Sequence, residues 1–288
     1  MSDYVIVTDA GCDLNNEMLK KYSISLVPLD VKFDTWETSR SSETIDAKSL
    51  YDNLRNGQVA TTSAANTEVF KEKFEEILKS GKDVLYIGFS SGLSCTCQNA
   101  KIAADELKEI YPDRKIVVID TLAASLGFGL LVYKAALLKE KGEDIDSVAK
   151  WVEDSKLNMC HAFTVDDLMF LKRGGRVSAT TALVGTVLGI KPVLHVDDEG
   201  KLINIGKVRG RKASIQELVN MMKSYGYKNT DEEVFISHGD CLDDAKYLAK
   251  LVKEQLGFKN ITIGIIGPTI GAHSGPGTLA LFYFGSKR

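Results

Sequence analysis

Short apolar runs alternate with segments of helical periodicity along the first half of the chain. The clearest unit starts with the apolar run 84–89, continues through a hydroxyl-rich turn at 90–96, and ends with small apolar residues at helical spacing over 100–107. An apolar run bounded by glycine and followed by a 3.6-residue period is typical of a strand, a turn and a helix. We therefore predict a buried strand that leads into a helix through a cluster of hydroxyl groups.

The same alternation extends over the segments on either side. It predicts strands at 4–8, 24–29 and 116–119, and helices at 48–54, at 68–78 and from about 122 to 138. Residues 34–48 are predicted as a loop, 60–63 as a second hydroxyl-bearing turn, and Asp13 as the cap of a first helix. Strands that alternate with helices predict a three-layer α/β domain over residues 1–160. In such sheets ligands bind outside the carboxyl ends of the strands, where these turns would converge.

The second half of the chain has a different pattern. Apolar runs at 190–196 and 202–208 are separated by Asp-Asp-Glu-Gly, which indicates a hairpin. Helices are predicted at 214–222 and 243–256, and strands at 234–237, 262–266 and 279–284. A glycine-rich segment at 271–277 is predicted to form a turn between the last two strands. We predict an α+β domain over residues 161–288.

Composition and charge exclude several classes of protein. The 288 residues are 44% apolar and 26% charged, and the formal net charge of −3 gives no global field that favours nucleic acid. Basic residues gather only locally, at 172–176 and 207–212. No uncharged apolar run approaches the roughly 20 residues that span a bilayer, and the N-terminus lacks the pattern of a signal peptide. We expect a cytoplasmic protein without a transmembrane segment.

The five cysteines are scattered and odd in number, so their spacing indicates no disulfide framework. Cys95 and Cys97 lack a second nearby pair, which argues against a metal site. Reduced thiols fit a cytosolic protein better. We therefore expect no metal and no cofactor.

The hydroxyl-rich turn 90–96 has two interpretations. Ser and Thr satisfy the unpaired N–H groups at the start of a helix, and one hydroxyl is enough for that purpose. Several hydroxyls together with the positive end of the helix dipole also attract an anionic oxygen. In addition, residues 88–92 match the G-x-S-x-G elbow, with Ser90 as the nucleophile and His238 or His273 as the base. A serine hydrolase is therefore an alternative, although the hydroxyls continue past the elbow to Ser94.

His273 is the histidine with the most suggestive surroundings. Gly271 and Gly275 flank it, and glycine lets a ligand or another backbone approach closely. Lone histidines are more often structural than functional, so His273 is a candidate and His238, at a predicted strand end, is a weaker one.

A series of motifs in order resembles one known family over nearly the whole chain. The motifs are VTDAGCDL at 7–14, ATTSAANTEVF at 60–70, SSGLSCTCQNA at 90–100, VIDTLAASLGFG at 118–129, DDLMFLKRGGRVS at 166–178, GIKPVLHVDDEGKL at 189–202, KVRGRKAS at 207–214 and IGAHSGPGTLALFYFG at 270–285. Together they resemble the DegV family of fatty-acid-binding proteins that serve a bacterial fatty acid kinase. Each motif is modest by itself, but eight in the same order make chance a poor explanation.

The resemblance implies two domains with a fatty acid between them. Thr62 and Ser94 would hold the carboxylate, and His273 and Arg209 would lie near it during phosphorylation by a separate ATP-binding kinase subunit. Further lining candidates are Ser63, Ser91 and Gly92. The chain has no G-x-x-x-x-G-K-[ST] phosphate loop of its own, which fits a non-catalytic acyl-binding partner.

The chain also departs from the family pattern. Cys95 stands where the family has a glycine and Cys97 where it has a tyrosine, while Ala64 and Ala65 replace a Gln-Pro pair. If position 95 requires a positive φ, Cys95 would be strained and could displace Ser94. We therefore predict a carrier of one long-chain fatty acid, with a serine hydrolase or a lipid-transport protein without a kinase partner as alternatives.

Overall fold

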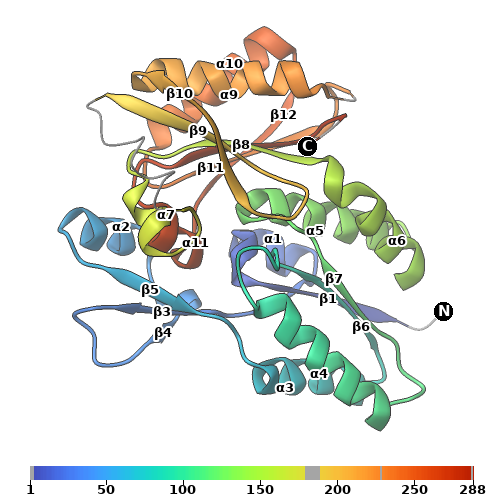
Figure 1. The fold of residues 1–288 in the computed structure, drawn as a ribbon. Coiled ribbons are helices and arrows are strands. Elements are labelled where there is room, and N and C mark those ends of the chain that lie inside the picture. Colours follow the sequence, from blue (N-terminus) through green and yellow to red (C-terminus); the bar gives the residue numbers. More distant parts are fainter. Residues whose placement is uncertain (1–2, 179–188, 228, 287) are drawn as a thin grey trace.

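A four-stranded parallel sheet organises the first half of the chain (Figure 1). The computed structural model describes residues 3–178, 189–227, 229–286 and 288. The sheet has the order β2-β1-β6-β7, formed by β1 (Tyr4–Asp9), β2 (Ser25–Val27), β6 (Asp83–Gly88) and β7 (Ile116–Asp120). All six residues of β6 are buried, which explains why its sequence is almost continuously apolar rather than alternating.

Helices cover both faces of this sheet. One face packs against α3 (Thr67–Lys79) and α4 (Thr96–Ile110) through a core that includes Phe70, Phe74 and Tyr86. The other face packs against α1 (Asn16–Lys21), α5 (Ser125–Glu140) and α6 (Ile145–Ser155). The predicted three-layer α/β arrangement is confirmed.

A six-stranded sheet organises the second half. Its order is β10-β9-β8-β13-β11-β12, from β8 (Met159–Thr164), β9 (Ile190–Val196), β10 (Leu202–Arg209), β11 (Glu233–His238), β12 (Asn260–Ile265) and β13 (Leu279–Phe284). β9 and β10 pair antiparallel, which confirms the predicted hairpin. The outer face of the sheet is covered by α9 (Arg211–Tyr225) and α10 (Leu242–Leu256). The predicted boundary between residues 160 and 161 falls inside β8, and the division at that point stays a prediction.

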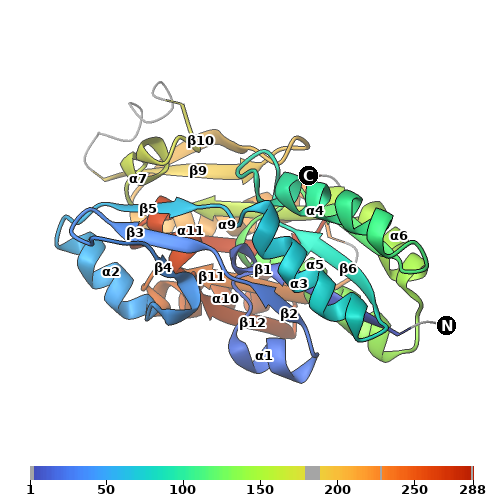
Figure 2. The ribbon, with the colours of Figure 1, turned by 90° about the horizontal axis from the view of Figure 1, so that it is seen from below.

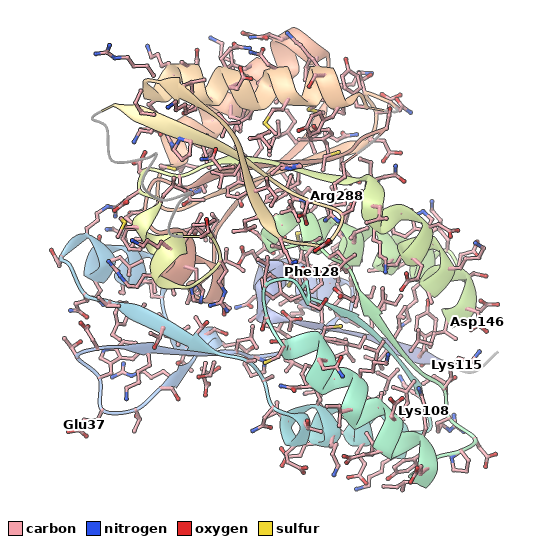
Figure 3. The ribbon with its side chains drawn as sticks, in the orientation of Figure 1. Glu37, Lys108, Lys115, Phe128, Asp146 and Arg288 are labelled. Carbon is pink, nitrogen blue, oxygen red and sulfur yellow. The ribbon has the colours of Figure 1, made fainter. Side chains whose placement is uncertain are left out.

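Helix α5 lies between the two sheets (Figure 1) and is buried on nearly all sides. Phe128, on this helix, is fully buried in the middle of the molecule, whereas Lys115 and Asp146 form an ion pair at its periphery (Figure 3). Gly127 permits close packing on one side, because a Cβ there would lie 2.5 Å from Nε2 of His161. Gly129 does the same on another side, against the carbonyl of Cys12 at 2.4 Å. The helix therefore joins both halves into one core.

A small third sheet connects the two halves at one end of the molecule. It consists of β3 (Asp30–Phe33), β4 (Arg40–Ser41) and β5 (Ala60–Ser63), and α2 (Ala47–Arg55) packs beside it. Figures 1 and 2 show this unit next to α11 (Pro268–Ser274) and α7 (Met169–Arg173), at the opposite end from α6. Three short 3-10 helices are described: η1 (Ala10–Cys12), η2 (Ser42–Thr44) and η3 (Lys156–Asn158).

Several local predictions were wrong. Residues 60–63 form strand β5, not a turn, because they pair with β3 along its length. The glycine-rich segment 271–277, predicted as a turn, begins inside helix α11, whose Gly271 packs against Tyr51 where a Cβ would lie 2.7 Å from the phenol oxygen. Asn15 caps α1, whereas the Asp13 carboxylate accepts a hydrogen bond from the N–H of Gly267 at 2.9 Å. The segment 34–48, predicted as a loop, contains β4 and η2 and the start of α2.

Two further features bear on function. Of the helices that the structure describes, none is both long and apolar enough to cross a bilayer. Across the described residues, no group of three His, Cys, Asp or Glu side chains is arranged to hold a metal ion.

Candidate functional site

A cavity of about 280 Å³ lies where the parallel sheet, the six-stranded sheet and the small sheet meet. Most of its wall is apolar. The apolar side chains include Phe89, Leu93, Phe163, Leu171, Ile270 and Phe282. Polar side chains from β5, the turn after β6 and α11 enter the same space. A mostly apolar cavity with a few polar groups is the usual form of a small-molecule site.

Thr62 and His273 meet at the polar end of the cavity. The Oγ1 of Thr62, on β5, lies 2.7 Å from Nε2 of His273, on α11. Burial, together with the charge of Arg176, lowers the pKa of His273 to about 4, so the imidazole is neutral at pH 7. The other ring nitrogen faces Gly174, where a Cβ would lie 2.2 Å from Nδ1. The position of the ring therefore depends on a glycine in the chain after α7.

Ser94 lies just before the N-terminus of α4. Its Oγ accepts a hydrogen bond from the N–H of Thr96 at 3.2 Å and lies 2.8 Å from Oγ1 of Thr96. If Thr96 donates in the second contact, the hydrogen of Ser94 is free to point at a ligand. A hydroxyl at the positive end of a 15-residue helix is well placed to bind an anionic oxygen.

Arg176 lines the same cavity, although it was not among the predicted site residues. Its Nε donates to the carbonyl of Leu93 at 3.1 Å, and another guanidinium nitrogen donates to the carbonyl of Gly174. Among the described residues that line the cavity, it is the one with a permanent charge. The sequence signal was the basic cluster at 172–176, which is most often a solvated surface.

The other predicted site residues are placed less uniformly. Ser63 is exposed and lines the cavity next to Thr62. Ser91 is exposed, and its N–H donates to the carboxylate of Asp120 at 3.2 Å. Gly92 packs against the turn between β9 and β10, and Arg209 is exposed at the end of β10. None of these last three is among the described residues that line the cavity, and their roles stay predictions.

Comparison with known proteins places the chain in a family. A sequence model of the DegV family, described as uncharacterised proteins, matches residues 3–286. The chain belongs to the DegV family. A DegV domain-containing protein of Clostridium perfringens is 43% identical over 289 residues, covering 100% of this chain and 99% of the relative. Another, from Lactococcus lactis, is 35% identical over 99% of this chain and 98% of the relative.

Solved structures of DegV proteins have the same fold. A DegV family protein of Thermus thermophilus, described by its fatty acid binding, matches with a TM-score of 0.89 and 30% identity over 99% of this chain and 100% of that one. DegV of Bacillus subtilis, described as a fatty acid binding protein, matches with a TM-score of 0.84 and 26% identity over 99% and 100%. The expected α/β fold of the DegV family is thereby confirmed.

The departure from the DegV pattern at Cys95 does not strain the backbone. Cys95 has a φ of −79°, outside the left-handed region. The backbone at this position is therefore unstrained and gives no reason for Ser94 to be displaced. Its side chain is exposed at the cavity. Cys97 is buried in the core between the sheet and helices α3 and α4.

Ser90 has the contacts of a structural residue. It is fully buried; its Oγ donates to the carbonyl of Gly200 at 2.8 Å and accepts from the N–H of Gly92 at 3.1 Å. Within the described part of the chain no histidine nitrogen hydrogen-bonds to it. The two proposed bases have other partners: His273 pairs with Thr62, and Nδ1 of His238 accepts from the N–H of Cys241. This geometry does not support the hydrolase alternative.

Proposed function

We propose that this protein binds one long-chain fatty acid in the cavity and presents its carboxylate to a partner fatty acid kinase. The observation that carries the proposal is the cavity itself, which is apolar along most of its wall and has Thr62, Ser94, His273 and Arg176 among its polar lining. The fatty acid binding described for the Thermus and Bacillus relatives supports it.

The polar end suits a carboxylate. With a neutral imidazole, the Nε2–H of His273 can donate to Oγ1 of Thr62, and the hydroxyl of Thr62 then donates to the ligand. Ser94 supplies a second donor from the start of α4. The guanidinium of Arg176 supplies the compensating positive charge that a buried carboxylate requires.

The apolar wall and the polar end have different energetic roles. Burying about 15 methylene groups contributes roughly 12 kcal/mol gross, at about 0.8 kcal/mol each. Each charge-assisted hydrogen bond to the carboxylate contributes only about 1.5–3 kcal/mol. The acyl tail of the ligand therefore sets the affinity. The hydroxyl groups of the protein set the orientation of the ligand and the preference for an acid over an alcohol or ester.

Phosphoryl transfer adds charge to the bound carboxyl group. A nearby imidazole or guanidinium stabilises that gain, which suits His273 inside the cavity. Arg209 is exposed on β10, so its part in the transfer would come through contact with the kinase. The protein would then act in the cytoplasm as the non-catalytic partner of an ATP-binding subunit, with the fatty acid as ligand and no cofactor.

Two measurements on the same preparation test the proposal. Native mass spectrometry and organic extraction are expected to find a fatty acid in the purified protein or after addition of palmitate or oleate. Addition of a cognate kinase and ATP is expected to yield acyl phosphate, and His273→Ala and Arg209→Ala are expected to retain lipid but lose this product. No acyl chain before or after addition would overturn the binding. Bound lipid without phosphorylation by any DegV-associated kinase would instead indicate a lipid-transport protein.

A further inference from the structure

A second group of polar side chains lines the cavity apart from the His273 end. It consists of Ser125 at the start of α5, Ser237 on β11 and Thr269 in the first turn of α11. The Oγ atoms of Ser125 and Ser237 lie 3.1 Å apart. Thr269 precedes His273 by four residues, so it lies about 6 Å from it along the helix axis. A fatty acid whose carboxylate lies at the His273 end would meet these hydroxyls along its acyl chain.

The partly buried carboxylate of Asp13 fixes the direction of one hydrogen-bond chain. One carboxylate oxygen accepts from the N–H of Gly267 at 2.9 Å, and the other accepts from Oγ of Ser125 at 2.5 Å. An ionised carboxylate can only accept, so the hydrogen of Ser125 is committed to Asp13. Ser237 must then donate to Ser125. Ser237 is left with an acceptor and no donor for the cavity.

Thr269 supplies the complementary group. Its Oγ1 is buried and has no hydrogen-bond partner in the described part of the chain, although the residue lines the cavity. Buried hydroxyls in native proteins are nearly always paired, because an unpaired one loses its hydration without compensation. The Oγ of Ser274, which directly follows His273 in α11, also has no partner among the described residues.

We propose that the cavity selects fatty acids that carry a hydroxyl group along the acyl chain. Such a hydroxyl would donate to Oγ of Ser237 and accept from the hydroxyl of Thr269. A plain chain leaves Thr269 unpaired, and an oxo group can satisfy Thr269 but not the acceptor on Ser237. The inference rests on the proposed function and names the class of ligand within it.

Competition binding at pH 8 tests the inference, because burial raises the pKa of Asp13 only to about 7 and most of its carboxylate is ionised at pH 8. The ligands are stearic acid, a set of hydroxystearic acids with the hydroxyl at different carbons, and the matching oxo acids. We expect at least one hydroxy isomer to bind about threefold to tenfold tighter than stearic acid, which corresponds to the net contribution of about one hydrogen bond. The same isomer should also bind tighter than its oxo analogue. Thr269→Val, of nearly the same shape, and Ser237→Ala are each expected to bring the hydroxy-to-stearic affinity ratio to one or below. Thr269→Ser keeps the hydroxyl and is expected to keep the ratio.

The outcomes separate this inference from the proposed function. If the parent protein binds stearic acid but no hydroxy isomer binds tighter than stearic acid, the selectivity is wrong and the fatty acid site stands. If Thr269→Val keeps the preference, the hydroxyl is recognised elsewhere and the assignment is overturned. If no acid binds, both proposals fall.

Discussion

The hydroxyl of Thr62 and the imidazole of His273 lie 2.7 Å apart although 211 residues separate them in the chain. Thr62 belongs to the small sheet that follows the first strands, and His273 belongs to α11 near the end of the chain. The contact therefore forms only when the two halves are packed together. A ligand held by this pair would contact both halves of the chain at once.

Removing a donor at the polar end should weaken fatty acid binding without unfolding the protein. Thr62→Val and Ser94→Ala each delete one hydroxyl, and we expect each to cost about 1–3 kcal/mol of binding free energy. Ser91→Ala is the matched control, because Ser91 is exposed and lies outside the described lining of the cavity. Calorimetric titration with palmitate, with thermal unfolding alongside, measures both effects. Parent-like affinity in both variants would place the carboxylate elsewhere.

Ligand binding should change the protonation of His273. Without ligand its pKa is about 4, below the usual 6.5, so the folded protein binds fewer protons than the unfolded chain between these values. This contribution to stability is present above pH 6.5 and is lost as the pH falls toward 4. A bound carboxylate favours the imidazolium, so we expect palmitate to raise the pKa. An NMR titration of the His273 ring with and without palmitate checks this, and an unchanged pKa would mean that the carboxylate is distant.

Gly174→Ala should disturb the site through its contact with His273. The new Cβ would lie 2.2 Å from Nδ1 of His273, so the ring or the backbone must move. We expect a loss of about 1–3 kcal/mol in stability and a weaker affinity for palmitate. Gly206→Ala is the control, since a Cβ there meets no atom of the described residues within 4 Å, and the stability of this variant should stay within about 0.5 kcal/mol of the parent. Equal affinities in the two variants would show that the ring position is unimportant for binding.

The predictions from sequence succeeded where local pattern decides the structure. The strand, hydroxyl turn and helix around 84–107 were predicted correctly, because a buried parallel strand is continuously apolar and its helix has a clear period. Strand β5 was missed, since Ala-Thr-Thr-Ser is polar and only its pairing with β3 makes it a strand. Helix α11 was missed because Gly271 suggests a turn, yet its packing against Tyr51 requires a glycine.

The candidate site shows the same division between local and tertiary information. Ser94 follows from the turn at the start of a helix, and His273 follows from the glycines that flank it. The family resemblance added Thr62. Arg176 was overlooked because a local run of basic residues is most often a solvated surface. Only the folded chain shows its guanidinium at the cavity, held by the carbonyls of Leu93 and Gly174.

Asp13→Asn should remove a pH dependence of stability. Burial, with a smaller contribution from Asp9, raises the pKa of Asp13 to about 7. Between about 3.9, the value in an unfolded chain, and 7 the folded protein binds more protons than the unfolded chain. This contribution is therefore present below about pH 4 and is lost as the pH rises through 7. Urea unfolding at pH 5, 6 and 8 should show the parent losing a few kcal/mol at most over this range from Asp13.

The asparagine variant isolates this effect, because its amide oxygen can still accept from Gly267 and its NH₂ can donate to Ser125. Asp9, whose pKa burial also raises, is present in both proteins and cancels in the comparison. We expect the variant to have the flatter dependence, with its advantage over the parent largest at pH 8, where the parent must keep a partly buried carboxylate ionised. Parallel curves between pH 5 and 8 would mean that Asp13 has the same charge in the folded protein as in the unfolded chain, where it is ionised over this range. The carboxylate would then be ionised throughout, and the direction of the hydrogen bonds from Ser125 and Ser237 would hold at every pH of the binding experiments.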